Sequence, residues 1–219
     1  MTAPATSNSP STNDKIVLEQ SARSRAFTQL KRIVQSAFTL LVAHRLLTYS
    51  IAQRLVGDRA FLAASESIAR IPGLRGVYCR QAFYRRTLSA CGQDMYPGWM
   101  STFSMRQAEV AENVYIGRRC SIGFATIAAK VMLADGVQLL SGGREHGEGG
   151  AGDSHQDQPQ TFERIKIGEG AWIGTNAIIM ADVGAHAIVG AGAVVTKAVP
   201  DYGVAVGVPA KVVRMLNDK

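Results

Sequence analysis

The sequence lacks the features that mark several classes of protein. Its longest apolar segment, residues 27–57, is interrupted by Lys31, Arg32, His44, Arg45 and Arg54. No apolar run therefore approaches the roughly 18 residues that a membrane-spanning helix needs. There is no P-loop and no Gly-x-Gly-x-x-Gly motif in a strand–helix setting, which argues against a nucleotide cofactor bound by those motifs.

Cysteine is scarce as well. Cys79, Cys91 and Cys120 are the only three, and they form neither a CxxC pair nor a metal-ligand spacing. A sparse, odd set of this kind is typical of a reducing compartment, so we expect a cytoplasmic protein with buried or idle thiols. Residues 1–17 are polar, low in complexity and without the charge-then-apolar order of a signal peptide, and we predict a disordered tail there.

Acidic residues are few in the first half of the chain. Residues 1–112 hold 14 Lys and Arg against 7 Asp and Glu, whereas residues 113–219 hold 10 of each, so the whole net charge of +7 lies in the first half. Such a bias indicates nucleic acid, an anionic membrane surface, an acidic substrate or a solvated helical face. No nucleic-acid signature accompanies the cations, so we expect no nucleic-acid partner.

Residues 18–104 have the periodicity of helices. Apolar residues recur at steps of three and four, as at Phe27, Leu30, Val34, Phe38 and Leu41. We predict an N-terminal α-helical region over residues 18–104. Its basic helices suit three alternatives, which are peripheral association with the inner face of a membrane, packing on a partner subunit and capping of the second domain. We favour the last two over the membrane.

After residue 105 the period changes to six. The repeated unit is an aliphatic residue, often followed by Gly or Ala, at Val110, Ile116, Ile122, Ile127, Leu133, Leu139, Ile167, Ile173, Ile179, Val183, Val189 and Val195. A period of six fits neither a helix nor a single strand, and it predicts a solenoid of short strands over residues 105–215. The step from Ile179 to Val183 is only four residues, which the repeat does not explain.

The repeat is interrupted by a polar, glycine-rich segment that holds His146 and His155. We predict that residues 143–164 form a loop extruded from the solenoid, because a close-packed interior cannot admit a substrate.

The repeats, together with "IGEGAWIGTNAIIM" and "IVGAGAVVTKAVPDYGVAVGVPAKVVR", resemble the hexapeptide-repeat acyltransferases, which include sugar O-acetyltransferases and serine acetyltransferase. The resemblance implies a mainly β fold, a left-handed parallel β-helix, in a homotrimer with active sites between subunits. The helical N-terminal region looks most like acetyltransferases of exopolysaccharide biosynthesis. One departure is Val208, where the family usually has Asn before Pro-Ala-Lys.

The resemblance further implies that a loop histidine acts as general base while an acetyl group moves from acetyl-CoA to a hydroxyl, less often an amine, of a sugar or polysaccharide precursor. We favour His146 as this base over His155, because it lies near the start of the loop where the scaffold can hold it. Glu145 is a candidate for orienting the imidazole. Ser141 and Arg144 are the candidate acceptor contacts, and the acceptor is expected to be a carbohydrate, with a lipid-linked carbohydrate as one alternative.

The resemblance also places acetyl-CoA as the co-substrate, with no metal. The candidate cofactor contacts are Trp172, Gly190, Ala191, Gly192, Thr196, Lys197, Lys211 and Arg214. Alternation makes Ile173 the inward residue and Trp172 the outward one. Lys211 and Arg214 carry the positive charge that CoA phosphates require.

Two alternatives stay open at this point. A γ-carbonic-anhydrase-like metalloenzyme would use three histidines, but the spacing of His146, His155 and His186 does not resemble that pattern. A catalytically inactive trimeric scaffold is favoured by Val208 and by the stretch "GFATIAAK", which lacks the Asn that sugar acetyltransferases use near the acceptor.

Overall fold

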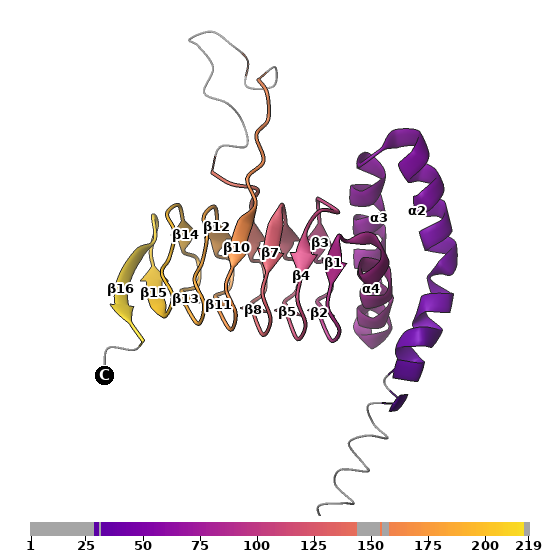
Figure 1. Ribbon diagram of the computed structural model, residues 1–219, viewed down its shortest axis with the longest axis horizontal. Coiled ribbons are helices and arrows are strands. Elements are labelled where there is room, and N and C mark those ends of the chain that lie inside the picture. Colours follow the sequence, from indigo (N-terminus) through magenta and orange to yellow (C-terminus); the bar gives the residue numbers. More distant parts are fainter. Residues whose placement is uncertain (1–28, 31, 144–153, 155–157, 217–219) are drawn as a thin grey trace, which may run out of the picture.

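The computed structural model describes residues 29–30, 32–143, 154 and 158–216. In the described part of the chain, helical residues 32–41 and three further helices precede a stack of short strands (Figure 1). The helices are α2 (Ala43–Val56), α3 (Arg59–Ala69) and α4 (Gly73–Thr87). The predicted tail, residues 1–17, lies outside the described residues.

The strands form three sheets that are parallel except for β16, and each of the first four coils contributes one strand to each sheet. Sheet A contains β1 (Ala90–Cys91), β4 (Glu109–Val110), β7 (Ala125–Ile127) and β10 (Ile165–Ile167). Sheet B contains β2 (Tyr96–Pro97), β5 (Tyr115–Ile116), β8 (Met132–Leu133), β11 (Trp172–Ile173), β13 (Ile188–Val189), β15 (Gly203–Val206) and the antiparallel β16 (Lys211–Met215). Sheet C contains β3 (Thr102–Phe103), β6 (Ser121–Ile122), β9 (Gln138–Leu139), β12 (Ile178–Ile179) and β14 (Val194–Val195).

The aliphatic residues of the six-residue repeat fill the interior of this three-sided β-helix. All twelve that the sequence singles out are at most 2% exposed. A glycine often follows them because neighbouring coils approach closely there. A Cβ on Gly168 would lie 2.3 Å from the Ala185 nitrogen, and one on Gly174 would lie 2.5 Å from the Ala191 nitrogen. The repeat therefore encodes both the core and the spacing of the coils.

The corners of the β-helix explain the short step in the repeat. The corners after sheets A and B carry residues with positive φ six positions apart, such as Asn113 and Arg119. The third corner, from sheet C back to sheet A, varies in length. Ile167 pairs with Val183, and Val183 pairs with Val199, so the corners from Ile179 and from Val195 each take four residues. The corner from Ile122 to Ile127 takes five, so the step from Ile179 to Val183 is one of the short third corners.

The first coil begins at Ala90, fifteen residues before the boundary at residue 105 that the repeat indicates. Its three strands place Cys91, Pro97 and Phe103 in register with the inward residues of the second coil. These residue types interrupt the aliphatic-glycine pattern, which is why the sequence alone assigns this coil to the helical region.

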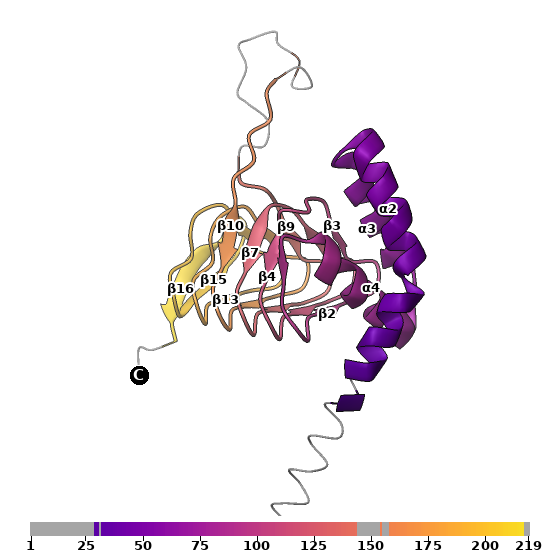
Figure 2. The same cartoon turned by 45° about the vertical axis from the view of Figure 1, so that its right-hand side comes forward.

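The helices cover the open end of the first coil (Figures 1 and 2). Arg80 of α4 is fully buried and donates from Nε to the Pro97 carbonyl oxygen at 3.0 Å and from Nη1 to the Ile71 carbonyl oxygen at 2.7 Å. Burial lowers the pKa of this guanidinium. Ser65 of α3 accepts from the Phe103 N–H at 2.9 Å, and its hydroxyl lies 2.9 Å from the Tyr84 hydroxyl oxygen. These buried polar contacts fix the helices on the coils.

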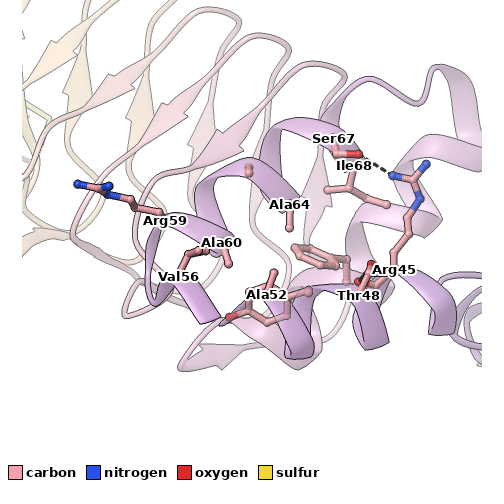
Figure 3. A pocket seen from close by; sticks show the side chains of 12 residues that line it. Arg45, Thr48, Ala52, Val56, Arg59, Ala60, Ala64, Ser67 and Ile68 are labelled. Carbon is pink, nitrogen blue, oxygen red and sulfur yellow. Dashed lines mark hydrogen bonds between the residues drawn. The ribbon is translucent and has the colours of Figure 1, made fainter. Parts of the chain in front are cut away.

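Helix α2 lies outside α3, on the side away from the strands (Figures 1 and 2). Small side chains on the facing surfaces, including Ala52, Ala60 and Ala64, leave a cavity of about 370 Å³ between the two helices (Figure 3). Arg45 closes one edge of it by donating to the Ser67 hydroxyl at 2.8 Å.

Candidate functional site

The interruption of the repeat leaves the β-helix at the third corner. The chain departs after β9 in sheet C and returns at β10 in sheet A, and residues 158–164 project away from the coils (Figure 1). The inserted segment therefore takes the place of a third corner, which spans four residues in each of the next two coils. The loop predicted at 143–164 falls in this insertion, and its residues 144–153 and 155–157 lie outside the described residues.

Hydrogen bonds hold the neck of this loop. The Glu163 N–H donates to the Ser141 carbonyl oxygen at 2.7 Å, which joins the departing and returning chains. Ser141 is 3% exposed, and its hydroxyl accepts from the Phe124 N–H at 3.1 Å. The two ends of the loop are thus fixed to each other and to the coil beneath.

Arg164 fixes the returning chain to the outer side of sheet A. It forms an ion pair with Glu109, donates to the Thr126 hydroxyl at 3.1 Å and to the Gln107 carbonyl oxygen at 3.1 Å, and lies 4.4 Å from the centre of the Phe124 ring. The hydrogen bond from Arg164 holds the pKa of Glu109 below its ordinary value. Sequence reasoning missed Arg164, because a single arginine at the end of a polar loop belongs to no motif.

A groove of about 670 Å³ lies at the base of the loop. It is lined by the loop neck and by the third corners of the next coils, namely Gly142, Gly143, Glu163, Arg164, Ile165, Met180, Ala181, Asp182, Thr196 and Ala198. The carboxylate residues Glu163 and Asp182 line it together with the apolar residues Ile165 and Met180. This combination suits a ligand that has both a polar and an apolar part.

A second cavity, of about 630 Å³, lies on the other side of the neck. It is more apolar and is bounded by the start of α3 and by the returning chain, with Asp58, Arg59, Leu62, Ser104, Met105, Gln107, Phe124, Gln160 and Phe162 as its lining. Arg164 lines the groove and Phe124 lines this cavity, so the contact between these two side chains lies between the two spaces.

The predicted catalytic residues lie beyond the described part of the neck. His146, its alternative His155, Glu145 and Arg144 fall outside the described residues. Gly143, the last described residue before this segment, lines the groove. Ser141 is placed by the structure in the neck, with its hydroxyl and carbonyl oxygens both bonded to the protein.

Trp172 faces outward as alternation predicts. It is 51% exposed, while its neighbour Ile173 is fully buried. On the outer face of sheet B it is in register with Met132, which is in register with Tyr115, and Tyr115 stacks on Tyr96 at 5.0 Å. Sheet B is the face opposite the corner from which the loop leaves, so within one chain Trp172 and the loop lie on different sides of the β-helix.

The other predicted cofactor residues are divided between two corners and the C-terminal strand. Gly190, Ala191 and Gly192 form the corner from sheet B to sheet C, and the N–H groups of Gly190 and Gly192 donate to the Ala205 and Thr175 carbonyl oxygens at 2.9 and 2.8 Å. Their backbone donors therefore already bond to adjacent coils.

Thr196 and Lys197 are exposed at the third corner, where Thr196 lines the groove beside the loop neck. Lys211 and Arg214 are exposed on β16, which extends sheet B. The structure thus brings Thr196 together with the loop neck, but it does not bring Trp172, Lys211 or Arg214 there.

Among the described residues, no group of three or more His, Cys, Asp and Glu is arranged to hold a metal ion. His186, the solenoid histidine that is described, is exposed at a corner and stacks on Tyr202 with ring centres 5.2 Å apart. Of the helices in the part of the chain that is described, none is long and apolar enough to cross a bilayer.

The sequence is similar to those of known transferases. Residues 164–197 match the family described as bacterial transferase hexapeptide (six repeats). Galactoside O-acetyltransferase of Escherichia coli (strain K12) is 34% identical over 119 residues, which cover 49% of this chain and 56% of that protein. The chain thus spans little more than half the length of this relative.

Solved structures share the fold. A maltose O-acetyltransferase from Clostridium difficile 630 superposes with a TM-score of 0.65 and 23% identity over 76% of this chain and 90% of that one. A galactoside acetyltransferase in complex with coenzyme A superposes with a TM-score of 0.50 and 23% identity over 74% and 84%. The likeness confirms the predicted left-handed parallel β-helix with an N-terminal helical region.

Proposed function

Because the chain carries the bacterial transferase hexapeptide repeat, we propose that it is a CoA-dependent O-acetyltransferase that acetylates a sugar or a polysaccharide precursor in the cytoplasm. The observation that carries the proposal is the loop inserted at the third corner, with its fixed neck and the groove at its base. The names of the relative and of the two solved structures agree with this reaction class.

In this proposal, His146 removes the proton from the acceptor hydroxyl. The hydroxyl oxygen attacks the thioester carbonyl carbon, the carbon–sulfur bond breaks, and the CoA sulfur leaves and takes up the proton that the imidazole carries. His146 follows the described neck by three residues, so the bonds at Ser141 limit how far it moves. Glu145 orients the imidazole by accepting from its second ring nitrogen.

Arg144 is the proposed contact to the acceptor at the start of the loop. A similar role for Ser141 stays a prediction that requires a change at the neck, because its hydroxyl is buried and bonded to the Phe124 backbone. The groove and the apolar cavity meet at the contact of Arg164 with Phe124, so we propose that the co-substrate and the acceptor approach the loop from opposite sides of this contact.

We propose that the complete site forms between two protomers of a homotrimer. The loop leaves one corner of the β-helix, whereas Trp172 lies on the opposite face. A site that uses both must therefore take the loop from one protomer and sheet B from another. The exposed row of Tyr96, Tyr115, Met132 and Trp172 is the apolar surface that such an assembly covers.

Acetyl-CoA is the proposed co-substrate, held in a groove that two adjacent protomers form between them. Thr196 and Lys197 reach it from the loop corner, and the corner at Gly190, Ala191 and Gly192 contributes backbone groups. The N–H groups of Gly190 and Gly192 are already bonded, and the Gly190 carbonyl oxygen accepts from the Ala193 N–H at 3.3 Å. A carbonyl oxygen has two lone pairs, so the carbonyl groups of this corner can still accept from the amide N–H groups of pantetheine. Lys211 and Arg214 supply charge for the phosphates.

The test is CoA release, measured with a thiol reagent, from acetyl-CoA and a panel of sugars and oligosaccharides. We expect acceptor-dependent release, and we expect His146→Ala to lower kcat by about 10²–10⁴ while His155→Ala retains most of the activity, since only the first removes the general base. Loss of activity only in His155→Ala would transfer the role to that residue. Unchanged rates in both variants would contradict a histidine base.

CoA release also tests the inactive scaffold, and a metal analysis tests the metalloenzyme. An inactive scaffold would release no CoA with any acceptor and would bind acetyl-CoA no better than a protein without the groove. Stoichiometric zinc or iron in the purified protein, with hydration of carbon dioxide, would instead favour a metalloenzyme of the γ-carbonic anhydrase type.

A further inference from the structure

The outward face of the first long helical segment is apolar. Five aliphatic side chains follow one another along it, here called the outer row, and they are 52–78% exposed. They are Ile33, Leu40, Leu47, Ile51 and Leu55. Residues 32–41 are helical, and Leu47, Ile51 and Leu55 belong to α2 (Figure 2). Their spacing of seven, seven, four and four places them on one side of the helix.

The core of the protein does not account for the outer row. The opposite side of the same helix is the one that packs inward. Phe38 stacks on Tyr78 at 5.2 Å, Val42 is 1% exposed, and Tyr49 meets Phe61 and Phe83 edge to face. A helix at the surface of a globular protein normally has one apolar side, which faces the core. This helix has a second apolar side that the core does not cover. An exposed row of large aliphatic residues of this length marks a contact surface.

The charge around the outer row is of one sign. From residue 20 to residue 57 the sequence has six Lys and Arg and no Asp or Glu. Arg32 and Arg54 are exposed on the same helical segment. An apolar helical face bordered by cations is the arrangement that lies in the interface of an anionic bilayer, with the aliphatic side chains among the acyl chains and the cations at the headgroups.

A second copy of the chain fits this surface less well. Two outer rows in contact would bring the cations of both copies together, with no acidic residue on either segment to pair with them. An anionic lipid surface supplies the missing opposite charge. The helices in the described part of the chain do not span a bilayer, so the contact is one that lies on the membrane surface.

We propose that the outer row, with Arg32 and Arg54, docks the protein on the surface of a membrane that contains anionic lipids. The helix lies parallel to the bilayer, and the β-helix extends away from it because α2 is the outermost element at the helical end (Figure 1). The docking depends on no step of the proposed acetyl transfer. It would bring the site to acceptors at the membrane, which gives the proposed lipid-linked carbohydrate a physical basis.

The test is flotation of the full-length protein with vesicles of phosphatidylcholine alone or with added phosphatidylglycerol. We expect binding to the anionic vesicles and little to the neutral ones. Leu47→Gln/Ile51→Gln should weaken binding at least tenfold by removing buried apolar area, and Arg54→Gln should weaken it about fivefold. Val213→Gln and Lys166→Gln are the matched controls, an exposed valine on β16 and an exposed cation on sheet A, and both should bind as the wild type does.

Three results of the vesicle assay would overturn the proposal. They are absence of the wild type from the floating fraction, equal binding to neutral and anionic vesicles, and unchanged binding of Leu47→Gln/Ile51→Gln. A lipid-free assembly that is larger for the wild type than for this double variant would also overturn it, because a second copy would then cover the outer row. Circular dichroism of each variant confirms that it is folded, and acetyl-CoA turnover in solution should be the same for all of them, which separates this test from that of the enzymatic function.

Discussion

At the scale of single residues, neighbours in the sequence lie on opposite faces of a strand. Ile173 is fully buried inside the β-helix, whereas Trp172, one position earlier, is 51% exposed on sheet B. The alternation of a strand makes this division predictable from the sequence alone. What Trp172 contacts in the proposed assembly is not encoded in that alternation, because such a contact depends on the surface of another protomer.

This pair gives a matched test of the interior. We expect Ile173→Ala to lower the free energy of unfolding by about 2–5 kcal/mol, because it opens a cavity between stacked coils. Trp172→Ala should leave the secondary structure intact and should act on assembly and CoA-dependent activity instead. Chemical denaturation followed by circular dichroism measures the first effect. A greater loss of secondary-structure stability in Trp172→Ala than in Ile173→Ala would contradict the assignment of inside and outside.

The thiols give a second test at this scale. Burial raises the pKa of Cys79 and Cys120, and it raises the pKa of Cys91 to about 12. Because the thiolate is the reactive form, all three should resist a disulfide reagent at pH 8 in the folded protein and react together once it is unfolded. Rapid labelling of one thiol in the native protein would show that its surroundings are open to solvent.

At the scale of elements, the sequence predicts the repeat better than it predicts where the repeat begins. Every aliphatic position of the period-six pattern is buried, and the four-residue step proves to be a short third corner that recurs from Val195 to Val199. The first coil was assigned to the helical region because Cys91, Pro97 and Phe103 replace the aliphatic residues. Arg164 was missed because its contacts join residues up to 57 positions apart, which no local pattern records.

The junction of helices and coils depends on Arg80, and this predicts a large effect of one substitution. In Arg80→Ala the carbonyl oxygens of Pro97 and Ile71 lose the Arg80 donor, while that of Ala69 keeps the Met100 N–H. We expect the free energy of unfolding to fall by about 3 kcal/mol or more. Arg75→Ala, at an exposed position of the same helix, is the control and should change it by less than about 0.5 kcal/mol. Equal effects in a urea titration would show that the buried contacts do not hold the helices.

At the scale of the whole molecule, the two ends of the protein have separate proposed tasks. The helical end presents the outer row to a membrane, and the third corner carries the loop and its groove. Between them, the β-helix holds the loop on one side and Trp172 on the other. A single chain therefore keeps Trp172 and the loop apart, and in the proposed homotrimer two protomers together complete the site.

Complementation between two inactive variants tests this central claim most directly. His146→Ala and Trp172→Ala are each expected to be nearly inactive, and they are unfolded, mixed in equal amounts and refolded together before acetyl-CoA turnover is measured. A site between protomers is intact when its loop comes from a Trp172→Ala chain and its sheet B from a His146→Ala chain, so random mixing restores about a quarter of wild-type activity. Activity no higher than that of the separate variants, from a mixture shown to contain both chains in one assembly, would contradict a site shared between protomers.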